Sequence, residues 1–208
     1  MVMRQKYLAP GNHGGARRKR PPGRPRSEQA RLAILRSTLQ LLGQSGFSDL
    51  SIEAVAAHAG VGKATVYRWW PDKAALITDA FASSTGQKLH FPDTGSVHTD
   101  MSQQMRQLTK IFLSRRGRIV SAILAAGQSD RDVIAAFRDR FMKPRRHEAY
   151  ATLQRGIQRG ELRKNVDMDL LLDSLYGPIY MRFLIRHRKL TPDFVDRLCD
   201  LVLAGARP

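Results

Sequence analysis

Residues that suit contacts with nucleic acid are concentrated between Lys63 and Lys73. A helix that enters a DNA groove presents hydrogen-bond donors and flat rings rather than a long apolar face, and this segment has both. Lys63 and Thr65 lie at the start of such a helix, the part that usually reaches base edges, whereas Tyr67 and Lys73 suit phosphate oxygens. We therefore predict a DNA-contacting group that consists of Ser51, Lys63, Thr65, Tyr67, Arg68, Trp69 and Lys73.

Two short helices joined by a tight turn would position these side chains. Ser51 is a good N-cap for the first helix, and Gly60 follows its last apolar position, where a left-handed turn ends a helix. The second helix would run from Lys63 to Trp70, because Pro71 pushes the preceding residue out of the helical region. This geometry is that of a helix-turn-helix, whose second helix enters the major groove. The alternative is an ordinary helical hairpin with a solvated basic face, which gives the Tyr-Arg-Trp-Trp-Pro sequence no role.

A longer pattern surrounds this segment, from about Ala30 to Leu76. It consists of Ile34, Leu41, Leu42, Gly46, Phe47, Leu50, Ser51, Val55, Ala56, Ala59, Gly60, Val61, Thr65, Val66, Tyr67, Lys73 and Leu76. In these positions the sequence resembles the TetR (tetracycline-repressor) family of bacterial transcriptional regulators. Thr38 replaces the usual Ala, Gly62 replaces a common Ser and so removes a possible hydroxyl contact, and Trp70 replaces a Phe that packs into the core.

Composition narrows the class of protein. The chain has 208 residues, of which 42% are hydrophobic, so it is long enough to bury a core and is not disordered throughout. The longest uncharged apolar run, Ile119 to Gly127, is too short to cross a bilayer, and the N-terminus lacks the apolar segment of a secretory signal. The single cysteine, Cys199, lies in an apolar helical pattern and indicates a structural thiol. These features predict a cytoplasmic protein with no membrane partner.

Residues 1–26 predict a flexible basic arm, because Gly, Pro and Arg dominate them. The arm carries eight Lys or Arg residues and no acidic residue, about half of the net charge of +17. A polyanionic partner is expected, and double-stranded DNA fits the helix-turn-helix. The run from Arg20 to Arg26 is similar to the minor-groove hook of architectural proteins, with Arg24 and Arg26 as its candidate DNA contacts. The alternative is a solubilising tail.

The rest of the sequence predicts only helices, because no stretch alternates as a strand would. A first helix, capped by Ser27, should end near Gln44, and a fourth, capped by Asp72, near Leu89. Residues 90–99 read as a loop, which we take as the boundary between a DNA-binding domain (27–89) and a C-terminal domain (100–208). The prediction is an all-α protein of about nine helices. A three-helix DNA-binding unit with a connecting helix precedes a helical bundle for ligand binding and dimerisation.

The C-terminal domain should contain five helical stretches. The first two cover residues 101–113 and 118–128. The third is capped by Ser129, kinked or divided at Pro144 and ended by Gly160. The fourth opens at Asp167 or Asp169 and is apolar almost all round, and the last opens at Pro192.

The last two helices need more cover than one small domain supplies. Pairing them with the same helices of a second subunit gives a four-helix interface with two-fold symmetry, as the family resemblance also implies. The candidate interface residues are Ile179, Phe183, Phe194, Leu198, Leu201 and Val202.

A small-molecule effector would bind among the helices of residues 101–188. Aromatic side chains are the candidates for its pocket, although aromatics at helical spacing are more often core. These candidates are Phe112, Phe137, Phe141, Tyr150, Tyr176 and Tyr180.

The leading hypothesis is a repressor that binds a near-palindromic operator as a homodimer and is released by an inducer. An architectural DNA-binding protein without an effector is the alternative. The sequence offers an enzyme little, because its six histidines show no zinc-ligand spacing and no nucleophile or phosphate-loop motif occurs. We expect no catalytic residue, no metal and no cofactor.

The basic arm generates a first testable prediction. If about three arm charges per subunit meet phosphates, deletion of residues 1–23 flattens the slope of log K against log salt by about 5 units for a dimer, because each released counterion contributes about 0.9. Titration of DNA at several salt concentrations measures the slope. An unchanged slope would show that the arm does not contact DNA.

Overall fold

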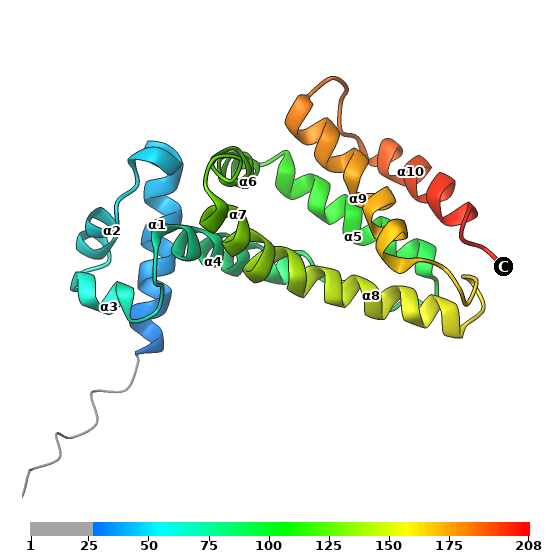
Figure 1. Cartoon of the computed structure of the whole chain (residues 1–208), viewed down its shortest axis with the longest axis horizontal. Helices are drawn as coiled ribbons and strands as arrows, with labels where there is room; N and C mark the ends of the chain where they lie inside the picture. Colours follow the sequence, from blue (N-terminus) through cyan, green and yellow to red (C-terminus); the bar gives the residue numbers. More distant parts are fainter. Residues whose placement is uncertain (1–26) are drawn as a thin grey trace, which may run out of the picture.

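The computed structural model describes residues 27–208, and every regular element in that range is a helix (Figure 1). Arg24 and Arg26, the two candidate contacts in the arm, lie outside the described residues. Residues 27–208 form nine helical rods, with the unbroken run 131–158 counted as one, which confirms the predicted all-α class. The elements are α1 (Glu28–Asp49), α2 (Ile52–His58), α3 (Lys63–Tyr67), α4 (Lys73–Thr85) with a 3₁₀ turn (Gly86–Lys88), α5 (Val97–Phe112), α6 (Arg115–Ala126), α7 (Arg131–Phe137), the π turn (Arg138–Met142), α8 (Lys143–Gln158), α9 (Met168–Ile185) and α10 (Pro192–Ala204).

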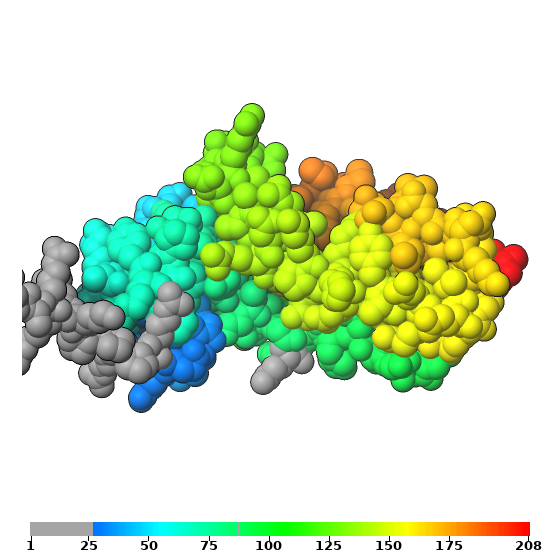
Figure 2. Space-filling model, turned by 60° about the horizontal axis from the view of Figure 1, so that its bottom comes forward, coloured from blue at the N-terminus to red at the C-terminus, as the bar shows by residue number. Residues whose placement is uncertain are grey.

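The described molecule is elongated, with α1–α3 at one end and the connection from α8 to α9 at the other (Figures 1 and 2). Helix α4 joins the two ends, because it packs against α1 on one side and against α6, α7 and the π turn on the other. Helix α5 contacts α6, α8, α9 and α10. Buried apolar side chains form one connected core from Ile34 in α1 to Leu203 in α10.

Helices α1, α2 and α4 begin at the caps that the sequence predicted. The Ser27 hydroxyl accepts from the amide of Ala30 at 3.3 Å, the Ser51 hydroxyl from Ala54 at 3.1 Å, and the Asp72 carboxylate from Ala75 at 2.7 Å. Gly46 interrupts α1 with a φ of 81°, close to the predicted end at Gln44. Gly60 has a φ of 67°, so the left-handed turn after α2 is confirmed.

Helix α3 is shorter than the predicted span of Lys63 to Trp70. It ends at Tyr67, and the amides of Trp69 and Trp70 both donate to the carbonyl of Val66. This tight turn carries the Trp70 ring into the core, where it is 1% exposed. The expected core role of Trp70 is confirmed, and its burial explains why the helix stops before Pro71.

The longest rod combines α7, the π turn and α8. Its cap is Asp130, whose carboxylate accepts from the amides of Asp132 and Val133; the predicted cap, Ser129, is off by one residue. Pro144 lies in the first turn of α8, directly after the π turn, and has no N–H to donate to that turn. The predicted kink or division at Pro144 is therefore a change of helical pitch rather than a break.

No helix within residues 27–208 is both long enough and apolar enough to span a membrane.

Close packing at Gly117, in α6, generates a stability prediction. A Cβ at this position would lie 1.9 Å from the carbonyl oxygen of Phe112, a backbone atom that cannot move alone. Gly117→Ala should therefore lower the free energy of unfolding by about 1–3 kcal/mol. Urea denaturation measures the difference.

The matched control is Gly43→Ala in α1, where a new Cβ meets no atom within 4 Å. There the substitution should stabilise by about 0.5–1 kcal/mol, because alanine loses less backbone entropy in a helix. Equal effects of the two substitutions would contradict the packing described for Gly117.

Candidate nucleic-acid interface

Helix α3 presents a polar, cationic face at one end of the molecule. Val66 is completely buried and anchors the helix, whereas Lys63, Tyr67 and Arg68 are exposed and Thr65 is half-buried. Tyr67 is 46% exposed, a high value for a tyrosine in a folded domain. The structure thus brings four of the predicted contact residues onto one accessible element.

Lys63 is held in place by two neighbours. Its ammonium forms an ion pair with Glu53 of α2, and it lies 5.7 Å from the centroid of the Tyr67 ring. The hydrogen bond from Lys63 lowers the pKa of the Glu53 carboxyl below its usual value. Because the pair is solvent-exposed, it contributes little to stability, but it orients the lysine. A DNA phosphate would compete with Glu53 for this cation.

Lys73, predicted as a phosphate contact, has hydrogen-bond partners within the chain. Its ammonium donates to the carbonyls of Phe47 at 3.1 Å and Ser48 at 3.3 Å, and it lies 5.1 Å from the Phe47 ring centroid. The side chain therefore fixes the connection between α1 and α2 from the first turn of α4. Sequence spacing does not reveal this contact, because Phe47 lies 26 residues away.

Trp69 is half-buried, and Ser51 is exposed at the start of α2. The Trp69 ring lies 5.9 Å from the guanidinium of Arg31 in α1 and 6.2 Å from the Trp70 ring. Ser51 accepts the capping hydrogen bond, which leaves its hydroxyl proton able to donate to a phosphate. The contact of Arg31 with the Trp69 ring was not indicated by the sequence pattern.

Asp79 links α3 to the C-terminal helices. Its Oδ2 atom accepts from Trp70 Nε1 at 2.8 Å and from Arg140 in the π turn at 2.9 Å. Trp70 lies at the end of the helix-turn-helix, and Arg140 lies in the π turn. One carboxylate oxygen therefore bridges two segments that are far apart in the sequence. No pattern in the sequence indicated this bridge.

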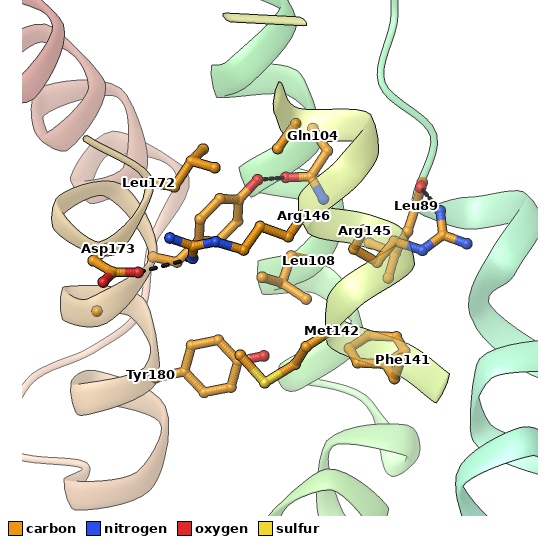
Figure 3. A pocket seen from close by; sticks show the side chains of 13 residues that line it. Leu89, Gln104, Leu108, Phe141, Met142, Arg145, Arg146, Leu172, Asp173 and Tyr180 are labelled. Carbon is orange, nitrogen blue, oxygen red and sulfur yellow. Dashed lines mark hydrogen bonds and ion pairs between the residues drawn. The ribbon is translucent and has the colours of Figure 1, made fainter. Parts of the chain in front are cut away.

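A cavity of about 250 Å³ lies in the C-terminal part, between α5, α8 and α9 (Figure 3). Three of the residues predicted for an effector pocket, Phe141, Tyr176 and Tyr180, line this cavity. Phe112 and Phe137 do not, because they are core residues: Phe112 stacks on Phe183 with centroids 4.2 Å apart, and Phe137 packs on Phe141 at 5.1 Å.

Tyr150 also lies away from the cavity, since its hydroxyl donates to Asp169. Periodicity identified the aromatic positions but could not distinguish which side of each helix faces the cavity. The cavity-lining residues that sequence reasoning missed are Leu89, Gln104, Leu108, Met142, Arg145, Arg146, Ala149, Leu172, Asp173 and Gly177.

The cavity contains one buried polar pair. The Tyr176 hydroxyl donates to the side-chain oxygen of Gln104 at 2.5 Å. Burial raises the pKa of the Tyr176 phenol above its usual value, so the phenol stays neutral and remains the donor.

The single cysteine, Cys199 in α10, is also buried. Burial raises the pKa of its thiol to about 12, which agrees with a structural rather than a reactive cysteine.

The predicted dimer-interface residues divide into two groups. Ile179 is fully buried, and Phe183 and Leu198 are 9% and 7% exposed, because these side chains pack inside a single chain. Their prediction as surface contacts needs correction. Phe194 and Val202 are half-buried and Leu201 is 76% exposed, so these three remain candidates.

The apolar surface of α9 and α10 lies at other positions. The exposed apolar side chains are Leu170, Met181, Leu184 and Ile185 on α9 and Leu201 on α10. Gly177 and Asp173 are also exposed, at helical spacing between Leu170 and Met181.

No cluster of three or more His, Cys, Asp or Glu side chains suited to a metal occurs in the described part of the chain. A three-helix unit that presents a cationic α3 at one end of a helical bundle defines a helix-turn-helix DNA-binding regulator. The family model for bacterial regulatory proteins of the tetR family matches residues 34–80, and that for tetracyclin repressor-like C-terminal domains matches residues 91–202. The chain belongs to the TetR family of transcriptional regulators.

Full-length relatives agree with this assignment. The HTH-type transcriptional regulator YdeS of Bacillus subtilis is 40% identical over 181 residues, which cover 87% of this chain and 90% of YdeS. The DNA-binding transcriptional repressor TetR of Mycobacteroides abscessus is 30% identical over 181 residues, 86% of this chain and 94% of that protein.

Solved structures share the fold. The crystal structure of the TetR family transcription regulator SCO0332 superimposes with a TM-score of 0.77 at 35% identity and covers 87% of this chain and 100% of that one. The transcriptional regulator FadR from Bacillus subtilis, in complex with stearoyl-CoA, has a TM-score of 0.65 at 17% identity and covers 85% and 99%, and it shows the fold alone.

The different environments of Arg68 and Lys73 generate a prediction. Arg68→Ala should reduce the slope of log K against log salt by about 1 unit for each phosphate that the arginine neutralises, with little effect on stability.

Lys73→Met should leave the slope unchanged and lower the free energy of unfolding by about 1 kcal/mol, because two backbone carbonyls lose their donor. DNA titrations at several salt concentrations and urea denaturation measure the two effects; a lower slope for Lys73→Met would restore it as a phosphate contact.

Proposed function

We propose that this TetR family regulator is a repressor that binds a near-palindromic operator as a homodimer and is released by a small molecule. The observation that carries the proposal is the bridge through Asp79, which ties the helix-turn-helix to the wall of the cavity. We infer that the protein acts in the cytoplasm, where it would meet operator DNA. The relatives are transcriptional regulators, which agrees with a role that involves no catalysis.

The exposed apolar face of α9 and α10 supports the homodimer. A monomer would leave Met181 56%, Ile185 68% and Leu201 76% exposed to water on adjacent helices. Burial of about 25 cal/mol per Å² of apolar surface favours pairing of this face with its copy in a second chain. Two α3 helices would then reach half-sites about 34–36 Å apart, one turn of DNA.

The route from the cavity to α3 supports release by a ligand. Phe141 and Met142 belong to the π turn and line the cavity, and Arg140 in the same turn holds Asp79. A ligand that displaces these side chains moves the acceptor to which Trp70 is bound. To change the DNA-bound fraction from 99:1 to 1:99, the ligand must differ by about 5.5 kcal/mol in its affinity for the two states.

The fold also supports an effector-binding role. FadR, which shares this fold, was crystallised with stearoyl-CoA. The shared fold supports the presence of an effector site in this protein and does not identify its ligand.

Selection of bound sequences from random DNA tests the proposal, and a substitution in the dimer face sharpens the test. The wild type should select a near-palindrome with half-site centres about 10 base pairs apart. Leu201→Glu should give a monomer by light scattering and lower operator affinity at least about 100-fold, because a buried charge without a partner opposes pairing.

The control is Ala151→Glu, which adds the same charge at an exposed position of α8, away from the proposed interface. It should leave both measurements unchanged. Selection without any sequence preference would instead favour an architectural DNA-binding protein, and a Leu201→Glu dimer would contradict the assigned face.

A further inference from the structure

The cavity lined by Gln104 and Tyr176 has a definite chemistry, and it determines which ligands can bind. Its walls are largely apolar, and Gln104 lies at one end of it and Tyr180 toward the other (Figure 3). Its volume of about 250 Å³ lies just below the range of about 300–1,000 Å³ for drug-sized pockets, so the ligand is smaller than most drugs.

Every cationic group that lines the cavity is already paired. Arg145 forms an ion pair with Glu148 at 3.2 Å and donates to the carbonyl of Leu89. Arg146 pairs with Asp169 and, at 2.8 Å, with Asp173. Among the described side chains around the cavity, two cations therefore face three carboxylates, and neither cation is left unpaired to hold an anionic ligand.

Asp173, the carboxylate that lines the cavity, is also paired, and its side chain is 70% exposed. Solvent screens its charge, so it offers a cationic ligand little. Transfer of an unpaired charge from water to the remaining apolar wall is costly for either sign. The charge distribution thus favours a neutral ligand.

Gln104 provides the polar recognition group. It is 2% exposed, and its side-chain oxygen is occupied by the Tyr176 hydroxyl. The amide nitrogen has no hydrogen-bond partner within residues 27–208, so it remains a donor at the cavity wall (Figure 3). The nitrogen borders the open space of the cavity, where the oxygen of a ligand can accept a hydrogen bond from it.

The opposite part of the cavity suits an apolar group. Phe141, Met142 and the ring of Tyr180 lie together there, away from Gln104, and the Tyr180 hydroxyl points toward Met142 (Figure 3). Met142 is 38% exposed and has a flexible thioether side chain that adapts to the shape of a ligand. A ring that packs between Phe141 and Tyr180 would bury apolar surface against both.

We propose that the effector of this regulator is a small, uncharged, mainly apolar molecule with one hydrogen-bond acceptor of the carbonyl type, which accepts from the Gln104 amide while its apolar end packs against Phe141, Met142 and Tyr180. This inference rests on the proposed function only in calling the ligand an effector. The binding chemistry stands on the cavity itself.

Three probes with nearly the same skeleton test the chemistry: the ketone benzylacetone, the carboxylate hydrocinnamate and the hydrocarbon butylbenzene. Binding to the full-length protein is measured by ligand-observed NMR titration. Benzylacetone should bind about five- to tenfold more tightly than butylbenzene, the value of one hydrogen bond, and at least about tenfold more tightly than hydrocinnamate. Preferential binding of hydrocinnamate, equal binding of all three, or no binding of benzylacetone overturns the proposal.

Two variants locate the effect at Gln104. Gln104→Leu with Tyr176→Phe replaces both members of the buried polar pair by apolar groups of similar shape, which is close to neutral for stability. This double variant should bind benzylacetone and butylbenzene equally well. The matched control, Tyr176→Phe alone, keeps the amide and should retain the preference for the ketone. A double variant that folds, by circular dichroism, and keeps the preference overturns the role of Gln104.

Release of operator DNA by the same probes separates the two proposals. If benzylacetone binds with the expected preference but leaves the operator bound, the cavity chemistry stands and release by this ligand class is wrong. If hydrocinnamate releases the operator through this cavity while benzylacetone does not bind, release by an effector stands and the neutral ligand class is wrong.

Discussion

A single carboxylate oxygen holds together the two parts of this molecule that must act as a unit. Oδ2 of Asp79 accepts from the indole of Trp70 and from the guanidinium of Arg140. The Asp79 side chain is only 28% exposed, so water replaces neither donor easily. The position of the turn after α3 is thereby tied to the position of the π turn, although α4 separates them. Helix α4 gives this tie its rigidity, because it packs on both sides.

The π turn is the second device on which this arrangement depends. An ordinary α-helix through residues 138–142 would present these side chains at different angles, since each residue advances by a smaller rotation in the wider turn. With the π turn in place, Phe141 packs against Phe81 at 4.9 Å and against Phe137 at 5.1 Å. Arg140 reaches Asp79 from the same turn, and Met142 reaches the cavity. One irregular turn therefore brings the cavity wall and the bridge to the DNA-binding helices together.

The dimer face and the cavity illustrate a common limit of sequence patterns. Helices α9 and α10 are apolar on wide faces, so periodicity alone does not tell which residues pack on α5 and which remain outside. Ile179 and Phe183 pack inward, whereas Met181 and Ile185 stay exposed on the same helix. The aromatic residues behave similarly: Tyr180 lines the cavity, but Phe112, whose ring lies 5.0 Å from it, belongs to the core.

The sequence by itself determined the local features: the caps at Ser27, Ser51 and Asp72, the left-handed glycine after α2, and the cationic segment of α3. Each depends on residues only a few positions apart, whose side-chain hydrogen bonds and backbone preferences act within one turn. Only the tertiary structure decided that Lys73 caps carbonyls near Phe47, that Asp79 joins Trp70 to Arg140, and that Gln104 meets Tyr176. Lys73 and Phe47 are 26 residues apart, Asp79 and Arg140 are 61 apart, and Gln104 and Tyr176 are 72 apart. Their geometry arises from helix packing rather than from any local pattern.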